Sequence, residues 1–183
     1  MISGVFLAPV YHVSGQNACE IYRIELFSRH YLVFYLHETL GMSLQDIKHL
    51  YGTQSGLLGL SQGLSGDMRT LTDASGQGDE RAATAVQAYC YQLKKQIGAF
   101  VAALGGADAL AFTGGIGQNS PQVRALALEG LACMGLVLDN EKNNNARAGD
   151  DISAAGSPTR LFVVATNEEI IIARKAKALL EGL

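Results

Sequence analysis

The clearest hydrophobic pattern in the chain lies between Asp79 and Leu104, where apolar residues recur three and four positions apart. These apolar positions are Ala83, Val86, Cys90, Leu93, Ile97, Val101 and Leu104. The spacing places them on one face of an α-helix, so the pattern predicts a long helix with one buried side. Gly105 and Gly106 follow directly and are expected to end that helix.

Two short apolar runs have the length and composition of buried strands. The first extends from Leu110 to Thr113, and the second from Arg160 to Ala165 (RLFVVA). A helical pattern follows each run. Strands that alternate with helices indicate an α/β architecture.

The helix after the first strand has clear boundary signals. Pro121 suits the first helical position, Ser120 or Asn119 can cap the helix, and Gly135 is expected to end it. The second strand leads into a final helix predicted over 168–181.

The first part of the chain is less regular. Residues 1–31 show no clear period, and the pattern from Leu32 to Gly41 predicts a short helix. Ser43, with Asp46 three residues later, resembles a capping box and predicts a second helix that ends at about Tyr51.

Two polar stretches are predicted to be loops. Ser55 to Arg69 contains four glycines and several serines, and its periodicity fails, so at most one turn of helix is expected at its end. Asp139 to Ser157 is rich in Asn, Gly and Asp and is expected to be a surface loop with little regular structure.

Composition narrows the class of protein. The chain of 183 residues suffices for one domain or for a piece of a larger protein, and its net charge of −3, without a dense Lys/Arg cluster, argues against nucleic acid as a partner. Because no run approaches roughly 18 apolar residues, no membrane partner is expected. Three widely spaced cysteines (Cys19, Cys90 and Cys133) predict neither a disulfide framework nor a zinc site and suit a reducing cytoplasm.

The stretch AFTGGIGQNS (111–120) is the strongest candidate site. Gly114, Gly115 and Gly117 lie between a predicted strand and a predicted helix. This is the layout of a nucleotide- or anion-binding loop, since glycines let the backbone approach a ligand. A plain glycine turn explains the stretch equally well by itself, and no Lys-Ser/Thr follows that would make it a Walker loop.

Two weaker candidates flank it. Asp67 and Arg69 end the loop SGDMR and could hydrogen-bond a sugar hydroxyl or a base edge, although a solvated loop with a local ion pair explains them better when they are taken alone. TNEE (166–169) could place one oxygen ligand for Mg²⁺, although a simple helix N-cap explains it better when it is taken alone.

Taken together and in this order, SGLLGLS and DMR, then FTGGIGQN, then VVATNEEIIIAR resemble the C-terminal half of the acetate kinase family, which includes propionate and butyrate kinases. The resemblance covers roughly Leu32 to Leu183 and extends to FYLHETLGMSLQDI. It implies the actin-like, ribonuclease-H-like α/β fold of the acetate and sugar kinase superfamily, with a sheet flanked by helices. Residues 32–183 would then be the C-terminal nucleotide-binding domain, and residues 1–31 a segment that does not match the family.

The resemblance also implies an activity and a set of site residues. The family transfers a phosphoryl group from ATP to a short-chain carboxylate such as acetate or propionate, giving an acyl phosphate and ADP, requires Mg²⁺ and is usually homodimeric. Matching positions imply adenosine contacts from Asp67, Met68 and Arg69, a magnesium ligand in Glu168, and a nucleotide loop made of Gly115, Ile116, Gly117, Gln118 and Asn119. The resemblance assigns no catalytic residue to this chain.

The chain departs from the family pattern at several points. Gln118 replaces the usual Glu of GGIGEN, which keeps hydrogen bonding but loses a charge, and the loop before Asp67 is one residue longer. The family's N-terminal phosphate loop, substrate arginine and catalytic aspartate have no counterpart. Arg29 lies near the place of the family's MGTRSGDxDP segment, but the surrounding motif is absent, so it is not assigned.

These departures predict that residues 1–31 are unrelated sequence joined to a truncated kinase that is weakly active or inactive alone. The alternative is a non-catalytic nucleotide-binding fragment or a partner-dependent subunit. Such a chain would self-associate or need a second polypeptide, because the missing domain would leave apolar surface exposed.

Overall fold

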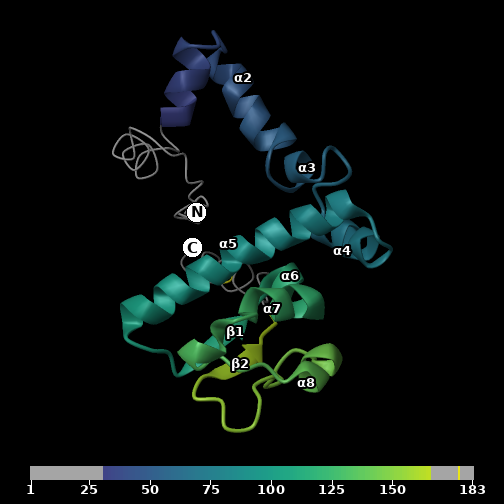
Figure 1. Cartoon of the computed structure of the whole chain (residues 1–183), viewed down its shortest axis with the longest axis vertical. Helices are drawn as coiled ribbons and strands as arrows, with labels where there is room; N and C mark the ends of the chain where they lie inside the picture. Colours follow the sequence, from purple (N-terminus) through teal and green to yellow (C-terminus); the bar gives the residue numbers. More distant parts are fainter. Residues whose placement is uncertain (1–30, 166–176, 178–183) are drawn as a thin grey trace, which may run out of the picture. The chain divides into compact units, whose positions relative to one another are not determined.

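The computed structural model describes residues 31–165 and residue 177 (Figure 1). The chain divides into two compact units, Met1–Gln96 and Ile97–Leu183, and each is described here by itself. The described part is mostly helical with one small parallel sheet. None of its helices is both long and apolar enough to cross a membrane.

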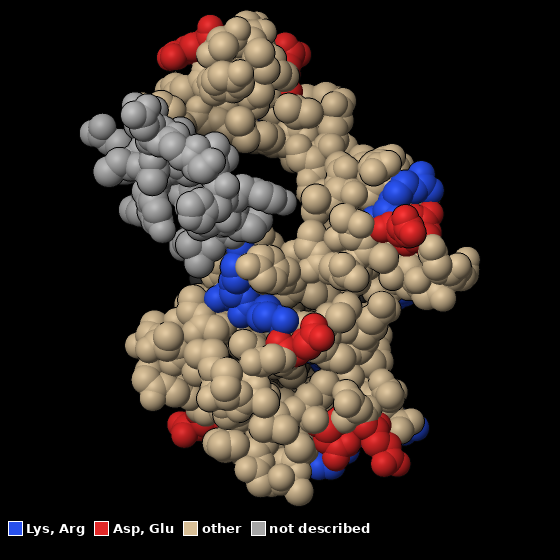
Figure 2. All heavy atoms as spheres, in the orientation of Figure 1, with Lys and Arg blue, Asp and Glu red and all other residues tan. Residues whose placement is uncertain are grey.

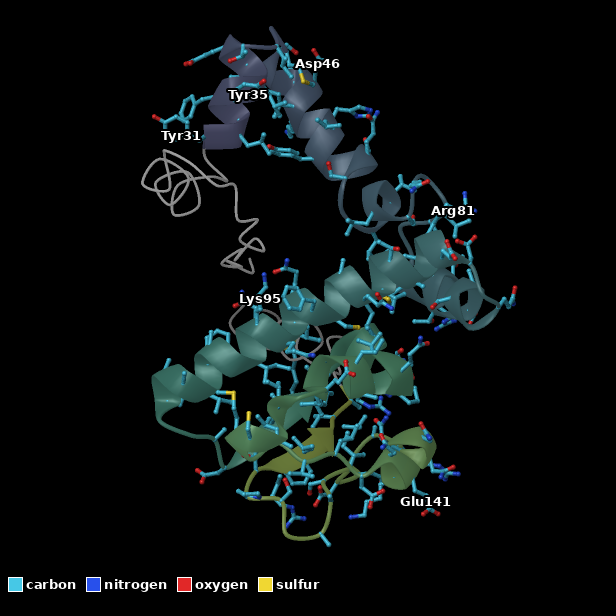
Figure 3. All side chains as sticks on the ribbon, in the orientation of Figure 1. Tyr31, Tyr35, Asp46, Arg81, Lys95 and Glu141 are labelled. Atoms are coloured by element: carbon cyan, nitrogen blue, oxygen red, sulfur yellow. The ribbon has the colours of Figure 1, made fainter. Side chains whose placement is uncertain are left out.

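The first unit begins with the helix expected after Tyr31, which spans residues 31–38. Tyr31 and Tyr35 project from it and are exposed (Figure 3). Gly41, with φ of 68°, lies in the turn after it, as the sequence suggested.

Helix α2 (Leu44–His49) confirms the predicted cap. The Ser43 hydroxyl accepts a hydrogen bond from the Asp46 N–H (3.1 Å) and donates one to the Asp46 carboxylate (2.6 Å). The chain continues as the π-helix η1 (Leu50–Gln54), so helical structure extends beyond the predicted end at Tyr51.

The prediction of a loop from Ser55 to Arg69 was wrong in part. Helix α3 (Gly56–Leu60) is a short turn in its first third, and helix α4 (Met68–Gly76) begins near its end. Apolar periodicity missed α3 because a helix of five residues is too short to show a repeat.

The long helix was predicted correctly and is α5 (Glu80–Leu104). Asp79 precedes it and accepts hydrogen bonds from the backbone N–H groups of Arg81 (2.9 Å) and Ala82 (3.1 Å). The Arg81 guanidinium pairs with the same carboxylate at 2.9 Å and lies at the start of α5 (Figure 3). This arrangement holds the pKa of Asp79 at about 2, well below its usual value.

The predicted apolar face of α5 is largely buried, with Val86, Cys90, Ile97 and Val101 all under 8% exposed, whereas Leu104 is 74% exposed. Burial raises the pKa of the Cys90 thiol to about 11. Cys90 and Cys133 are both free thiols.

The second unit is organised around two parallel strands, β1 (Ala109–Phe112) and β2 (Arg160–Val163), which lie side by side in Figure 1. Both strands were expected, with slightly different ends. Only Phe112 of β1 is buried, so the expectation of a fully buried first strand was wrong, while Leu161 and Val163 of β2 are buried as predicted.

The single helix predicted from Pro121 to Gly135 is two elements. Helix α7 (Pro121–Leu128) is capped by Ser120, whose hydroxyl accepts from the Val123 N–H at 3.3 Å. The 3-10 helix η2 (Leu131–Met134) follows. Gly130 separates them in a left-handed conformation with φ of 77°, which a helix interior does not accommodate.

The prediction of little regular structure from Asp139 to Ser157 also failed in part. Helix α8 (Asn140–Asn145) begins at Asp139, whose carboxylate accepts from the backbone N–H groups of Glu141 and Lys142. Later residues of the stretch form isolated antiparallel bridges, Leu138 with Ser153 and Asp151 with Phe162. The buried apolar residues of this unit are Ile97, Val101, Phe112, Val123, Ala127, Leu128, Leu131, Leu136, Ile152, Leu161 and Val163.

Candidate functional site

The glycine stretch does not form an open loop. Residues Gly114–Asn119 form the short helix α6 between β1 and α7. Thr113 is extended, and Gly114 has φ of 72°, a left-handed conformation that reverses the chain at the end of β1 and that glycine adopts without strain. The sequence placed the first helical turn after Pro121, whereas the structure places one within the glycines themselves.

Helix α6 packs tightly against the strand that precedes it. A β-carbon added to Gly117 would lie 3.2 Å from the carbonyl carbon of Phe112, a backbone atom that cannot easily move away. Gly115 differs, because a β-carbon there would meet no atom within 4 Å, and Gly115 is exposed. One glycine therefore permits packing against β1, and the other leaves backbone open on the exposed side.

A buried arginine lies behind the helix. Arg124, on α7, is 0% exposed, and its Nη1 donates hydrogen bonds to the carbonyl oxygens of Gly117 and Gln118, each at 2.9 Å. A helix leaves its last carbonyls without intrahelical donors. Arg124 therefore satisfies the C-terminal end of α6 with its side chain.

Asn143, on α8, holds the other side of the guanidinium. Arg124 Nε donates to Asn143 Oδ1 (2.7 Å), and Arg124 Nη2 donates to the backbone oxygen of Asn143 (2.8 Å). The Asn143 amide in turn donates to the Pro121 carbonyl at 2.9 Å. Asn143 is 1% exposed, so its hydrogen bonds with Arg124 are shielded from water.

All of these hydrogen-bond acceptors are neutral. Burial lowers the pKa of Arg124, but a guanidinium titrates so far above neutrality that it remains charged. The nearby Glu141 carboxylate, on the outer side of α8, points away into solvent (Figure 3). The second unit thus keeps a positive charge behind α6, compensated by carbonyl dipoles in the described part of the chain.

The second predicted cluster belongs to the first unit. Asp67 is exposed and caps α4: its Oδ2 accepts from the Thr70 N–H and the Thr70 hydroxyl, each at 3.0 Å. These bonds lower the pKa of Asp67. Arg69 is exposed, whereas the Met68 side chain is 3% exposed and lies in the core, so a ligand would reach Met68 through its backbone.

The remaining predicted residues divide as follows. Ile116, Gly117 and Gln118 are half-buried within α6, and exposed Asn119 donates through its side chain to the Gly115 carbonyl at 2.9 Å. Glu168 lies outside the described residues. Within the described part, no three carboxylate, histidine or cysteine side chains gather as metal ligands. A single carboxylate can suffice for Mg²⁺ when nucleotide phosphates and water complete the shell, so this observation does not conflict with Glu168 as a ligand.

Sequence analysis did not single out Arg124 or Asn143. A signal for the arginine was present, because Arg124 is three and four positions before Ala127 and Leu128 and therefore shares the apolar face of α7. No comparable signal marked Asn143, one of four asparagines within residues 140–145. On the face shown in Figure 2, basic side chains lie beside acidic ones in several small groups, and other acidic side chains stand alone.

Comparisons with known proteins place this arrangement in a family. The sequence pattern of the acetokinase family matches residues 30–174. The acetate kinase of Coprothermobacter proteolyticus is 46% identical over 144 residues, which are 79% of this chain and 36% of that protein. The acetate kinase of Desulforamulus reducens is 46% identical over 148 residues, 81% of this chain and 37% of that protein.

Solved structures agree. The match to the crystal structure of Porphyromonas gingivalis acetate kinase has a TM-score of 0.72 at 38% identity and covers 81% of this chain and 37% of that one. The match to a propionate kinase from Francisella tularensis has a TM-score of 0.69 at 32% identity, covering 87% and 38%. The chain thus spans little more than a third of the length of these relatives.

Proposed function

The chain belongs to the acetokinase family, and on that premise we propose that it is the nucleotide-binding part of a phosphotransferase that acts between ATP and a short-chain carboxylate such as acetate. The proposed reaction gives an acyl phosphate and ADP. We propose further that its full fold is the ribonuclease-H-like C-terminal domain of that superfamily, over residues 32–183.

The observation that carries the proposal is helix α6. It places exposed Gly115 backbone at the end of a strand, within a segment that matches the family. Glycine backbone at a strand-to-helix junction suits phosphate or nucleotide contact, because no side chain keeps the ligand away.

Each proposed site residue has a distinct role. Gly115 to Asn119 would contact the nucleotide, and Asp67 to Arg69 would contact adenosine, with Asp67 already fixed as the cap of α4. Glu168 would hold Mg²⁺. When bound, this ion would neutralise charge on the phosphates, and positioning with electrostatic stabilisation supplies most of the catalysis in phosphoryl transfer.

The 183-residue chain assayed by itself is expected to turn over acetate weakly or not at all. Sequence analysis found no counterpart in it for the family's substrate arginine and catalytic aspartate. A non-catalytic nucleotide-binding polypeptide, dependent on a partner for any chemistry, is the alternative. It is supported by the fact that the chain spans little more than a third of its relatives' length.

Self-association is part of the proposal, since the family resemblance implies a homodimer. In the described part of the first unit, the large apolar side chains of Tyr31, Phe34, Leu40 and Leu44 are more than half exposed. Exposed apolar surface of this kind favours association. Light scattering of the purified chain at several concentrations tests this point, and a strictly monomeric mass throughout would contradict it.

The experiment for nucleotide binding uses a matched pair of glycine substitutions. Gly115→Ala and Gly52→Ala both add a methyl group that meets no atom within 4 Å, so the fold should accept both. Calorimetric titration with ADP and Mg²⁺ should show binding to the unmodified chain and to Gly52→Ala. Binding to Gly115→Ala should be weaker by about tenfold, since the methyl group would displace the nucleotide from the backbone.

The outcomes separate the alternatives. Binding without acyl phosphate formation, measured by hydroxamate trapping with acetate or propionate, supports the non-catalytic polypeptide. Turnover comparable with that of a full-length acetate kinase would contradict the expected weak activity. Absence of ADP binding would overturn the proposed function.

A further inference from the structure

We propose that Arg124 is a positioning residue for helix α6. Held by Asn143, Arg124 fixes the C-terminal end of α6 and supplies positive charge behind this helix. This inference rests on the proposed function for its ligand, a nucleotide carrying phosphates. Its structural part, the control of α6 by Arg124, stands independently of any ligand.

Burial of the Arg124 guanidinium has an energetic cost. Moving a guanidinium out of water is unfavourable, and the usual compensation is a carboxylate partner. The partners of Arg124 are instead four neutral oxygens: two from α6 and two from Asn143. An apolar side chain would fill the same space without this desolvation cost. The arrangement is therefore explained by what the guanidinium holds and by its charge, beyond simple packing.

Helix α6 has little stability by itself. A helix of six residues is below the length that is stable in isolation, and the three glycines at 114, 115 and 117 lower its helix propensity further. The two hydrogen bonds from Arg124 Nη1 satisfy consecutive carbonyls, Gly117 and Gln118, at its end. Arg124 thus decides whether α6 is formed before a ligand arrives, and preformed sites bind more tightly.

The orientation of the Arg124 guanidinium is set by Asn143. Asn143 accepts from both Nε and Nη2, and its own amide donates to the Pro121 carbonyl at the start of α7. These three bonds fix the plane of the guanidinium and aim Nη1 at α6. Asn143 therefore acts on α6 through Arg124, because no hydrogen bond joins Asn143 directly to α6 in the described part of the chain.

The test uses four variants of the full chain and two controls. Arg124→Met removes both the charge and the hydrogen bonds of the guanidinium, and Arg124→Lys keeps the charge alone. Asn143→Ala removes the amide that orients Arg124, and Asn143→Asp places a negative charge beside Arg124. Arg147→Met and Asn144→Ala are the matched controls, because both residues are exposed and their side chains make no hydrogen bond with the described residues.

Two readouts separate positioning from general stability. Hydrogen exchange of the segment 113–120 is compared with that of strand β2, under conditions where circular dichroism shows each variant folded. In Arg124→Met, exchange at 113–120 should be faster by tenfold or more, while β2 changes by less than threefold. Calorimetry with Mg²⁺ and ADP, adenosine or pyrophosphate is the second readout.

The expected binding pattern is specific. Arg124→Met should weaken ADP and pyrophosphate binding by about tenfold or more and adenosine binding by less than threefold, because adenosine carries no phosphate charge. Arg124→Lys should recover part of the phosphate affinity. The phosphate affinities of Asn143→Ala and Asn143→Asp should fall between those of the unmodified chain and Arg124→Met, with Asn143→Asp the weaker binder of the two. The affinities of the controls should stay within twofold of the unmodified chain.

The outcomes are distinguishable. If the unmodified chain binds no ADP, the proposed function fails, and the exchange data alone then decide whether Arg124 positions α6. Unchanged exchange at 113–120 in both folded Arg124 variants would overturn the positioning role. ADP binding within twofold of the unmodified chain in Arg124→Met would overturn the role of the charge. Should Arg124→Met not fold, Arg124→Lys and Asn143→Ala carry the same comparison.

Discussion

Helix α6 and the start of helix α4 both carry residues proposed for nucleotide contact, yet they are held in place by different kinds of interaction. At α4, Asp67 bonds to Thr70, three positions along the chain, and the contact is exposed. At α6, Arg124 reaches Asn143, 19 positions away, and both side chains are buried. One segment is fixed locally and in contact with water, and the other depends on the assembled fold of its unit.

This difference explains how the two segments should respond to change. A local cap can be lost without disturbing distant residues, whereas a buried network transmits the loss of any member to the rest. Substitutions at α6 are therefore expected to have larger effects, and to reach α8, while those at α4 stay confined to its first turn.

The largest effect is expected from Arg124→Met. It leaves the carbonyls of Gly117, Gln118 and Asn143 without their donor, and each carbonyl that stays shielded from water costs about 1–3 kcal/mol, although the costs do not simply add. We expect the free energy of unfolding to fall by about 3 kcal/mol or more, measured by urea denaturation followed by circular dichroism. Arg147→Met, at an exposed position, should stay within about 0.5 kcal/mol. Equal losses in the two variants would remove the basis of the comparison.

Gly117→Ala should have the next largest effect. Its methyl group would lie 3.2 Å from a backbone atom of Phe112, so α6 and β1 must separate. Overpacking of this kind costs about 1–3 kcal/mol in the same denaturation experiment. Gly115→Ala, two residues away and in open space, should be neutral or stabilising by up to about 1 kcal/mol. If Gly117→Ala proved as stable as Gly115→Ala, the tight packing of α6 on β1 would be wrong.

Features that depend on neighbours along the chain were predictable from sequence. Ser43 with Asp46 and Ser120 before Pro121 were predicted correctly, because a cap and its partner lie within one helical turn. The long helix α5 was predicted from its continuous apolar stripe. The strands were recognised as short apolar runs, although only the structure reveals that two of the four residues of β1 are exposed.

The α6 network was not predictable in the same way. Nothing in a single sequence states that Arg124 and Asn143 meet, because the contact requires α7 and α8 to fold against each other. Helix α8 itself was hidden in a polar, asparagine-rich stretch that has no apolar period. Residues 114–119, three of them glycine, were interpreted as a loop, because helix propensity opposes the helix that tertiary contacts impose.

A moderate effect is expected from Asp67→Ala. Loss of the cap should fray the first turn of α4 and reduce adenosine affinity several-fold on the proposed function, with exchange at 113–120 unchanged. Calorimetry with adenosine and hydrogen exchange of 68–76 measure the two effects. Asp67→Asn is the control, because an asparagine side chain can still cap a helix. Faster exchange at 113–120 in Asp67→Ala would show that the two segments are not independently held.

Acid should affect the two segments differently. The pKa of Asp67 is lowered by its bonds to Thr70, and that of Asp79 is about 2. A depressed folded pKa means that the unfolded chain binds more protons, so the stabilisation is present above about pH 4 and is lost as the pH falls toward 2. The Arg124 network has neutral acceptors and should not respond in this range.

Hydrogen exchange at pH 4.5 and pH 3, corrected for the intrinsic pH dependence, checks this expectation. The first turns of α4 and α5 should lose protection, while 113–120 keeps its protection. The carboxylate of Asp151, whose pKa is also about 2, adds an acid-sensitive contact near β2 in the second unit. Strand β2 is therefore expected to lose protection before 113–120 and serves as the internal reference. Loss of protection at 113–120 before β2 would contradict the neutral character of the network.

The smallest effect is expected from Gln118→Glu. The side chain is half-buried, and its backbone carbonyl, not its amide, accepts from Arg124. Exposure to solvent screens an added charge, so ADP affinity should change by about twofold or less. Calorimetry at two salt concentrations measures the change. A shift of tenfold or more would place this side chain in direct contact with the phosphates.

The central claim is that helix α6, backed by Arg124, receives the nucleotide. Its most direct test is hydrogen exchange of the full 183-residue chain with and without saturating ADP and Mg²⁺. The account predicts slower exchange at 113–120 and at 65–72, with the surface helix α8 unchanged. Unchanged exchange at 113–120 in the presence of saturating nucleotide would contradict it.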